Sequence, residues 1–435
     1  MVFRLWLVDK AWHVDILSNA GWGEWIFDHG PGGFYENSAW TYSWPTQPPL
    51  TNLVYAWDKR LHVELLGRAA WLDYQLNRVL PGEKVPWLTD FVRWFGYGKI
   101  NNEIPFQIGY LMTIKLIPIL ADLGIAVLIY YFCGRRLLWP TVFLISPFSW
   151  YVSAMWGQYD SVGFLFALSG FVSLFTSFNI LGPGLLVLAI LIKPTSLIFL
   201  PFFVYLFWRK KRSWLAWIIP LVIFWVTTQP FTHKNPLEFA RYDLIRIVFE
   251  KSEPRVSVNA FNFWRIFIGD KAVNSGIKIL GLSVYSWGLI AFAVINISAI
   301  VIFRKEKEED AVRKALFVIG AGSFLFMTGM LDRYLYAGMV FGLIYVSGRR
   351  KLYELWAVWS IIFWVNLYYH WWIPESLETL KNLLLAENHA LTRILSLAAA
   401  AIFIAMVNPG LLPKLTPENF HKLRCLLNPW RRKQA

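Results

Sequence analysis

The stretch that decides how this chain folds is VYSWGLIAFAVINISAIVIFRKEK, residues 284–307. Its first 20 residues carry no charge, and ~20 helical residues are the length needed to cross the roughly 30 Å hydrocarbon core of a membrane. Three basic residues, Arg304, Lys305 and Lys307, lie at its end. An apolar run of this length that ends in a basic cluster predicts a transmembrane helix with an orientation signal.

The composition extends this prediction to the whole chain. Hydrophobic residues make up 57% of it and charged residues only 16%, whereas a soluble domain has roughly 25% charged residues. We therefore expect an all-α, polytopic transmembrane helical bundle of about 11 spans. The candidate spans are 105–132, 137–154, 161–178, 180–193, 194–208, 214–229, 276–303, 315–331, 335–347, 353–368 and 390–407.

Basic clusters occupy alternate connections between these runs. They are Arg135-Arg136, Arg209 to Arg212, Arg304 to Lys307, Arg349 to Lys351 and Arg431 to Lys433. This positive-inside pattern predicts that these connections are cytoplasmic. It also accounts for the formal net charge of +14, so nucleic acid is not expected as a partner. The only cysteines, Cys133 and Cys425, are too few for a disulfide framework or a zinc cluster.

The same pattern divides the chain into four parts. Residues 1–104 form an extracytoplasmic first loop, in which amphipathic stretches such as Leu53 to Leu80 lie on the membrane surface or in a packed outer domain. Residues 105–347 form a transmembrane module, residues 348–413 form C-terminal transmembrane helices, and residues 414–435 form a basic cytoplasmic tail. Because no helix precedes the first loop to carry it outward, we expect that an original first helix is missing from this sequence.

Ionisable residues gather on the side opposite the basic connections. A charge in hydrocarbon costs at least about 2.5–3.5 kcal/mol, so each one needs a reason. The residues on this outer side are Asp15, Asp160, Lys193 and the tripeptide Asp332-Arg333-Tyr334. Each has a structural alternative: Asp160 as a helix cap, Lys193 as a lysine that reaches the headgroups, and Asp332-Arg333 as a surface ion pair. Their convergence on one face favours a functional site.

The first loop is rich in aromatic residues. They are Trp22, Trp25, Phe34, Tyr35, Trp40, Tyr42 and Trp44. An interfacial aromatic belt explains some of them. Their density beside Gly30, Gly32 and Gly33 equally suits a binding surface on which rings stack against the C–H face of a sugar. Both interpretations stand at this point.

Five groups of residues occur in a characteristic order. They are Asp15 with Gly33-Phe34-Tyr35 and Trp44-Pro45, then Trp156-Gly157-Gln158-Tyr159-Asp160, Lys193-Pro194, Asn259 to Trp264, and Asp332-Arg333-Tyr334. This ordered set covers the chain to about residue 340 and resembles the GT-C superfamily, polytopic glycosyltransferases that use polyprenyl-phosphate sugars. The likeness is to prokaryotic relatives of the GPI and dolichyl-phosphate mannosyltransferases. The chain departs from such relatives in carrying Leu331-Asp332 where they often have His-Glu, and in lacking the first helix.

The resemblance implies a GT-C-like catalytic module, with Asp15 as the catalytic general base and Asp160 as a second acidic residue of the site. An acceptor hydroxyl that attacks an anomeric carbon must lose a proton, which a carboxylate can accept. Cations stabilise the departing phosphate, and Lys193 and Arg333 are the candidates. The candidate substrate-binding residues are Trp44, Trp156, Gln158, Asn259, Asn262, Asp332 and Tyr334.

We therefore expect an inverting hexosyltransferase, with mannose the expected sugar, and no cofactor or obligatory metal. Its partners would be a polyprenyl-phosphate sugar, membrane lipids, and a glycan, glycolipid or protein acceptor on the extracytoplasmic face of the cell membrane. Two alternatives remain: a lipid or glycan transporter or flippase, and a catalytically inactive GT-C homologue. Lys115 and Asp122, seven residues apart on one helix face, keep the transporter alternative open, although a structural polar pair explains them better than a proton relay.

Overall fold

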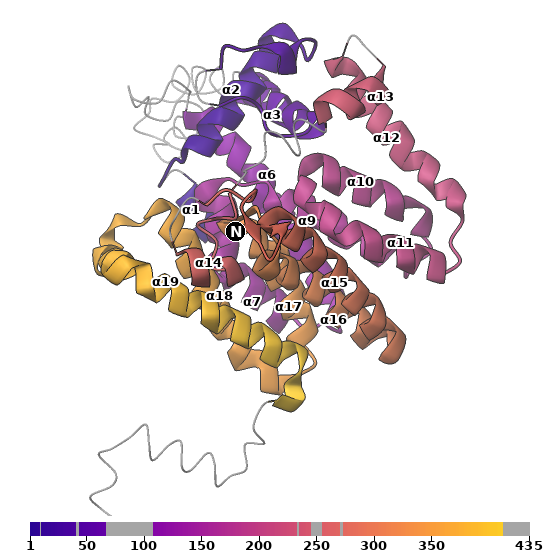
Figure 1. The fold of residues 1–435 in the computed structure, drawn as a ribbon. Coiled ribbons are helices and arrows are strands. Elements are labelled where there is room, and N and C mark those ends of the chain that lie inside the picture. Colours follow the sequence, from indigo (N-terminus) through magenta and orange to yellow (C-terminus); the bar gives the residue numbers. More distant parts are fainter. Residues whose placement is uncertain are drawn as a thin grey trace, which may run out of the picture.

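The computed structural model describes residues 1–8, 10–40, 43–66, 108–232, 235–244, 255–269 and 273–411. Within these ranges the chain is mainly helical, as the composition predicted, and the strands are β1 (Ser257–Val258), β2 (Lys278–Ile279), β3 (Leu282–Ser283) and β4 (Met330–Leu331) (Figure 1). Tyr42, the part of the amphipathic stretch that follows residue 66, and the predicted tail 414–435 lie outside the described residues.

Four helical segments in the described part of the chain are long and apolar enough to cross a membrane. They are Gly109–Phe132, Trp214–Phe231, Val284–Lys305 and Glu375–Val407. The stretch quoted first above forms the third of these, and its side chains at Leu289, Val294 and Ile297 are exposed. By length and composition, these helices indicate a helical chain that associates with a membrane.

The other predicted segments contain shorter or less apolar helices, and the following list gives the helices of all the predicted segments, the four long ones included. In order along the chain, the predicted segments hold α6 (Ile108–Phe132), α7 (Leu138–Ile145) with α8 (Pro147–Trp150), α9 (Asp160–Ser173), α10 (Gly182–Ile192), α11 (Leu200–Arg209), α12 (Ile218–Thr228), α15 (Val284–Lys305), α16 (Glu308–Phe326), α17 (Tyr336–Val346), α18 (Tyr353–Trp371) and α19 (Glu378–Val407). Proline explains two of the breaks. Ser146 and Lys193 precede Pro147 and Pro194 and adopt extended backbone, which ends α7 and α10.

The first loop contributes a helical layer of its own. The helices α2 (Val14–His29) and α3 (Pro49–Leu61) pack against each other and against α6 (Figure 1). They share an apolar cluster that includes Trp22, Tyr55 and Tyr110, separate from the main core of the bundle. The described part of the predicted amphipathic stretch is therefore in a packed layer.

The basic connections meet at one end of the bundle. Lys210, just after α11, forms an ion pair with Glu308, where α16 begins. Arg349 lies just after α17, and its Nη2 is 3.2 Å from Asp310 Oδ1. Because α16 starts at this end and α17 returns to it, the turn between them, residues 327–335, lies at the opposite end.

That opposite turn is held by a short parallel ladder. Strand β1 pairs with β4, with Ser257 opposite Met330 and Val258 opposite Leu331. The indole of Trp264 in α14 (Phe263–Ile268) also donates to the carbonyl of Phe326, at 3.0 Å. These contacts set the position of the 3₁₀ helix η10 (Asp332–Leu335), which follows β4 directly.

A buried polar network ties the start of the chain to the bundle. Arg4 in α1 (Val2–Leu7) forms an ion pair with Asp122 in α6 and donates to Ser153 Oγ at 2.7 Å. Tyr336 also donates to Asp122. Lys115 donates to the carbonyls of Val8 and Ala11, at 2.8 and 2.6 Å. Lys115 and Asp122 thus each bind a different part of the N-terminal segment, which fits the structural interpretation of these residues and not a relay between them.

Candidate active site

Asp15 lies in the first turn of α2, next to the Gly157 turn. His13 is the N-cap of α2, and its Nδ1 accepts the Asp15 amide at 3.1 Å. Gln158 Nε2 donates to Asp15 Oδ2 at 2.7 Å. Gly157 makes this approach possible because its φ is +77° and an added Cβ would lie 2.9 Å from Ile16 and from Lys115. The sequence motif at 156–160 is therefore a turn that brings Gln158 to Asp15.

Asp160 and Lys193 form a buried ion pair between neighbouring helices. Asp160 is the first residue of α9, and Lys193 ends α10. Lys193 Nζ lies 3.0 Å from Asp160 Oδ2, and both side chains are 6% exposed. Gly163 permits this contact, since an added Cβ there would lie 2.8 Å from Lys193 Cβ.

This pair overturns two of the structural alternatives raised by the sequence. Asp160 does not cap α9, because the N-cap is Tyr159 and no side-chain cap hydrogen bond forms there. Lys193 does not extend to the headgroups, because its ammonium is buried against Asp160. Both residues are held inside the fold by each other's charge.

Arg333 lies between three carboxylates contributed by separate elements. Its Nη2 is 3.8 Å from Asp15 Oδ2, its Nε is 3.8 Å from Asp160 Oδ2, and its Nη1 is 3.6 Å from Asp332 Oδ1. Its guanidinium carbon lies 5.1 Å from the centre of the Trp156 ring, in a cation–π contact. Asp332 is fully buried, so this ion pair is not at the surface.

These distances are too long for hydrogen bonds, which leaves polar atoms unsatisfied. In the described part of the chain, Arg333 Nε is buried without a hydrogen-bond partner, whereas Asp160 Oδ2 and Asp332 Oδ2 face Lys193 Nζ at 3.0 Å and His370 Nδ1 at 3.2 Å. Buried donors and acceptors without partners are costly and are expected where a ligand supplies the missing bonds. Among the three carboxylates Asp15 is the accessible one, with its side chain 33% exposed against 6% for Asp160 and 0% for Asp332.

His370, at the end of α18, completes the site and was not expected from the sequence. Its Nδ1 is 3.2 Å from Asp332 Oδ2 and 2.7 Å from Asn259 Nδ2. Its ring stacks on Trp156, with centroids 5.0 Å apart. The only sequence signal is a histidine within the aromatic run 368–372, which fits a membrane belt equally well.

A small cavity of about 30 Å³ adjoins the Asp160–Lys193 pair. Its polar lining includes Asp160, Lys193, Thr195, Ser196 and Tyr334. The ammonium of Lys193 and the hydroxyl groups are donors that suit phosphate oxygens, whereas the Asp160 carboxylate offsets the charge of Lys193. Thr195 and Ser196 were not identified from the sequence, because hydroxyl residues beside a proline are common in ordinary turns.

Two of the candidate substrate-binding residues have other contacts. Asn262 is the N-cap of α14, and its Oδ1 accepts from the Arg265 amide at 3.2 Å. That is a structural role in forming the helix. Trp44 packs against Tyr35, with centroids 5.8 Å apart, in the layer formed by α2 and α3. Trp156, Gln158, Asn259, Asp332 and Tyr334 all lie at the cluster around Arg333.

The charges of the site are shaped by burial and by Arg333. Burial alone would raise the pKa of Asp15, but the hydrogen bond with His13 and the charge of Arg333 outweigh burial and hold this pKa well below its usual range. Burial raises the pKa of Asp332 and lowers the pKa of His370. Asp15 is therefore ionised at neutral pH, and His370 is neutral there.

Comparison with protein-family models and with curated proteins finds no match to this chain. Within the described ranges, no three His, Cys, Asp or Glu side chains are arranged to hold a metal ion. The arrangement offers an accessible ionised carboxylate, two cations and an unsatisfied guanidinium N–H of Arg333. It can accept a proton at Asp15 and hold an anion near Arg333 and Lys193.

Proposed function

We propose that this protein is a membrane glycosyltransferase that moves a hexose, most simply mannose, from a polyprenyl-phosphate sugar to an acceptor, with inversion. The observation that carries the proposal is the position of Arg333, within 3.8 Å of both Asp15 and Asp160. An accessible carboxylate beside an incompletely bonded guanidinium fits the attack of a hydroxyl and the departure of a phosphate. The ordered motifs that resemble the GT-C superfamily support the same activity.

The proposed topology has about 11 spans, with the basic end of the bundle in the cytoplasm and the site on the extracytoplasmic face. The ion pairs of Lys210 and Arg349 gather the basic connections at one end, and the Asp332-Arg333 turn lies at the other. The exposed apolar side chains of α15 suit contact with lipid, the phase that holds a polyprenyl tail.

In the proposed reaction the acceptor oxygen attacks the anomeric carbon and its proton passes to Asp15. The bond from the anomeric carbon to the phosphate oxygen breaks, and its electron pair leaves with the polyprenyl phosphate. Arg333 and Lys193 stabilise the negative charge that grows on this phosphate. Inversion follows from a single displacement.

Because the pKa of Asp15 is low, the phosphate of the donor also affects how readily Asp15 accepts a proton. The charge of Arg333 contributes to that low pKa, which makes the carboxylate a weak base before substrate binds. A bound phosphate offsets the charge of Arg333 and so raises the pKa of Asp15. Proton acceptance then becomes favourable only when the donor is in place.

The test is transfer from radiolabelled polyprenyl-phosphate sugars in membranes, comparing the wild type with Asp15→Asn. A positioned general base contributes roughly a hundredfold or more, so the variant should lose at least that factor while it still folds. Glu36→Gln, which removes an exposed carboxylate of the same loop, is the matched control and should retain activity. A fully active Asp15→Asn protein, or a wild type that transfers none of the sugars, would overturn the proposal.

A further inference from the structure

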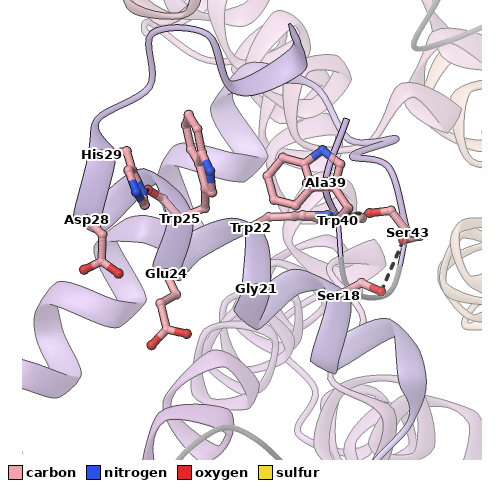
Figure 2. A pocket seen from close by; sticks show the side chains of 10 residues that line it. All are labelled: Ser18, Gly21, Trp22, Glu24, Trp25, Asp28, His29, Ala39, Trp40 and Ser43. Atoms are coloured by element: carbon pink, nitrogen blue, oxygen red, sulfur yellow. Dashed lines mark hydrogen bonds between the residues drawn. The ribbon is translucent and has the colours of Figure 1, made fainter. Parts of the chain in front are cut away.

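A second, larger pocket lies further along α2, in the layer that this helix forms with α3. It has a volume of about 250 Å³ and is lined by residues of α2 together with Ala39, Trp40 and Ser43. Figure 2 shows the rings of Trp25 and Trp40 near each other at this pocket, with the carboxylates of Glu24 and Asp28 on neighbouring turns of α2. The cluster around Arg333 does not use these residues.

The aromatic rings of the pocket are held in place by their polar edges. Trp22 Nε1 donates to the carbonyl of Ser43 at 3.0 Å, and Trp40 Nε1 donates to the carbonyl of Asn37 at 2.9 Å. The Trp25 and Trp40 rings are half-buried, with centroids 5.9 Å apart and planes tilted by 51°. The Trp22 ring is buried, so the ring surface offered to a ligand is that of the half-buried Trp25 and Trp40.

The polar lining restricts the ligand further. Asp28 is exposed, and Glu24 carries a charge partly offset by its ion pair with Lys59. Carboxylates accept hydrogen bonds from neighbouring hydroxyl groups but repel phosphate. Rings for stacking together with carboxylates for hydroxyl groups suit a neutral sugar, whereas the donor's phosphate is suited to Lys193 and Arg333.

The pocket is connected to the proposed base by one face of α2. Asp15, Ser18, Trp22 and Trp25 follow spacings of three and four residues, which places them along one stripe of the helix. At 1.5 Å per residue, Trp22 lies about 10 Å and Trp25 about 15 Å from Asp15 along the helix axis. Such a span is longer than one sugar ring and is bridged by a short oligosaccharide.

We infer that this pocket is a subsite for neutral hexose units of the acceptor, so that the acceptor is an oligosaccharide chain whose end reaches Asp15. The inference rests on the proposed function, because it is Asp15 as base that makes the other end of the stripe an acceptor path. It selects a glycan among the glycan, glycolipid and protein acceptors that the sequence left open, whether that glycan is free or carried on a lipid.

The test uses saturation-transfer NMR to measure the binding of methyl mannoside, mannobiose and mannotriose to the full chain in nanodiscs. Affinity should rise with the length of the saccharide. Trp40→Ala should weaken mannotriose binding about threefold to tenfold, the range expected for loss of one aromatic contact, and Asp28→Asn, at an exposed position that does not threaten folding, should also weaken it. The matched control is Phe27→Ala, which removes an exposed ring of the same helix that is not in the pocket lining and should bind as wild type does.

Failure of this inference and failure of the proposed function give different results. Asp15→Asn should bind mannotriose normally while its transfer activity falls at least about a hundredfold. The wild type could bind saccharides through Trp40 and Asp28 and yet show no transferase activity. That result would support the saccharide-binding pocket and contradict the proposed function. Absence of binding to all three saccharides, or equal binding by the wild type, Trp40→Ala and Asp28→Asn, would overturn the subsite whatever the activity.

Discussion

Replacing Lys193 by methionine separates its ion pair with Asp160 from its proposed binding of the donor phosphate. Methionine keeps much of the length of the side chain and removes the charge that lies 3.0 Å from Asp160 Oδ2. At an effective dielectric constant of about 20, charges at that distance attract by about 5 kcal/mol, and the Arg333–Asp160 contact at 3.8 Å gives about 4 kcal/mol. Arg333 therefore compensates Asp160 in part when Lys193 is lost.

Removing one partner of a buried pair commonly costs about 3–5 kcal/mol of stability, because the other charge stays buried alone. The compensation by Arg333 places Lys193→Met at the lower end, about 3 kcal/mol. The double variant Lys193→Met/Asp160→Asn removes the uncompensated charge and should regain about 2 kcal/mol or more. Lys278→Met, at an exposed position, is the control and should change stability by less than about 0.5 kcal/mol.

Unfolding in detergent can be followed with a thiol-reactive dye, since Cys133 is buried and becomes reactive only when the fold opens. Cys425 should be replaced by serine in every variant, so that Cys133 alone reports. The decisive comparison is between stability and activity. The double variant should recover stability while its KM for the polyprenyl-phosphate donor stays raised. A stable Lys193→Met protein would refute the electrostatic reasoning, and a double variant with a normal donor KM would refute phosphate binding by Lys193.

Three further variants test particular contacts. Gly163→Val should lower transfer activity, because its Cβ would lie 2.8 Å from Lys193 Cβ, whereas Gly348→Ala, with nothing within 4 Å of the added Cβ, should match wild-type activity. Burial raises the pKa of Asp58, so the stabilisation by the protonated carboxyl is present at acid pH and is lost as pH rises through the raised pKa. At alkaline pH, Asp58→Asn should therefore unfold at a higher temperature than the wild type. Equal unfolding temperatures of the two proteins at alkaline pH would contradict this. Asn262→Ala should cost about 1 kcal/mol of stability through the lost cap without changing the KM of either substrate, and a raised KM would instead support the substrate-binding role predicted from the sequence.

The helical elements were predictable because a membrane solvent leaves few choices. An apolar run must satisfy its backbone hydrogen bonds within itself, so the run at 284–303 had to be a helix. The breaks at Pro147 and Pro194 follow from the same backbone chemistry. Hydropathy does not determine the length of each helix, however. The segment 137–154 looked like a single span, and it forms two short helices and a π-helical turn.

The grouping of Asp15, Asp160, Lys193 and Arg333 was predictable as a tendency, since all four fall on connections at one face of the predicted bundle. The distances between them were not predictable. Lys193 reaches Asp160 because Gly163 lets α10 approach α9, and no periodicity signals that approach. No pattern in the sequence connects Arg4 with its partner Asp122, which lies 118 residues further along the chain.

The position of Arg333 has a consequence for how the protein is made. Asp15 and Asp160 are synthesised first, Lys193 follows them, and Arg333 comes last, 318 residues after Asp15 by subtraction of their numbers. While the chain emerges, Asp160 can pair with Lys193, but Asp15 has no arginine at its side until the turn between α16 and α17 is in place. The hydrogen bond with His13 lowers the pKa of Asp15 from the start, but the further lowering by Arg333 is acquired late in biosynthesis, and a chain released before residue 333 would lack it.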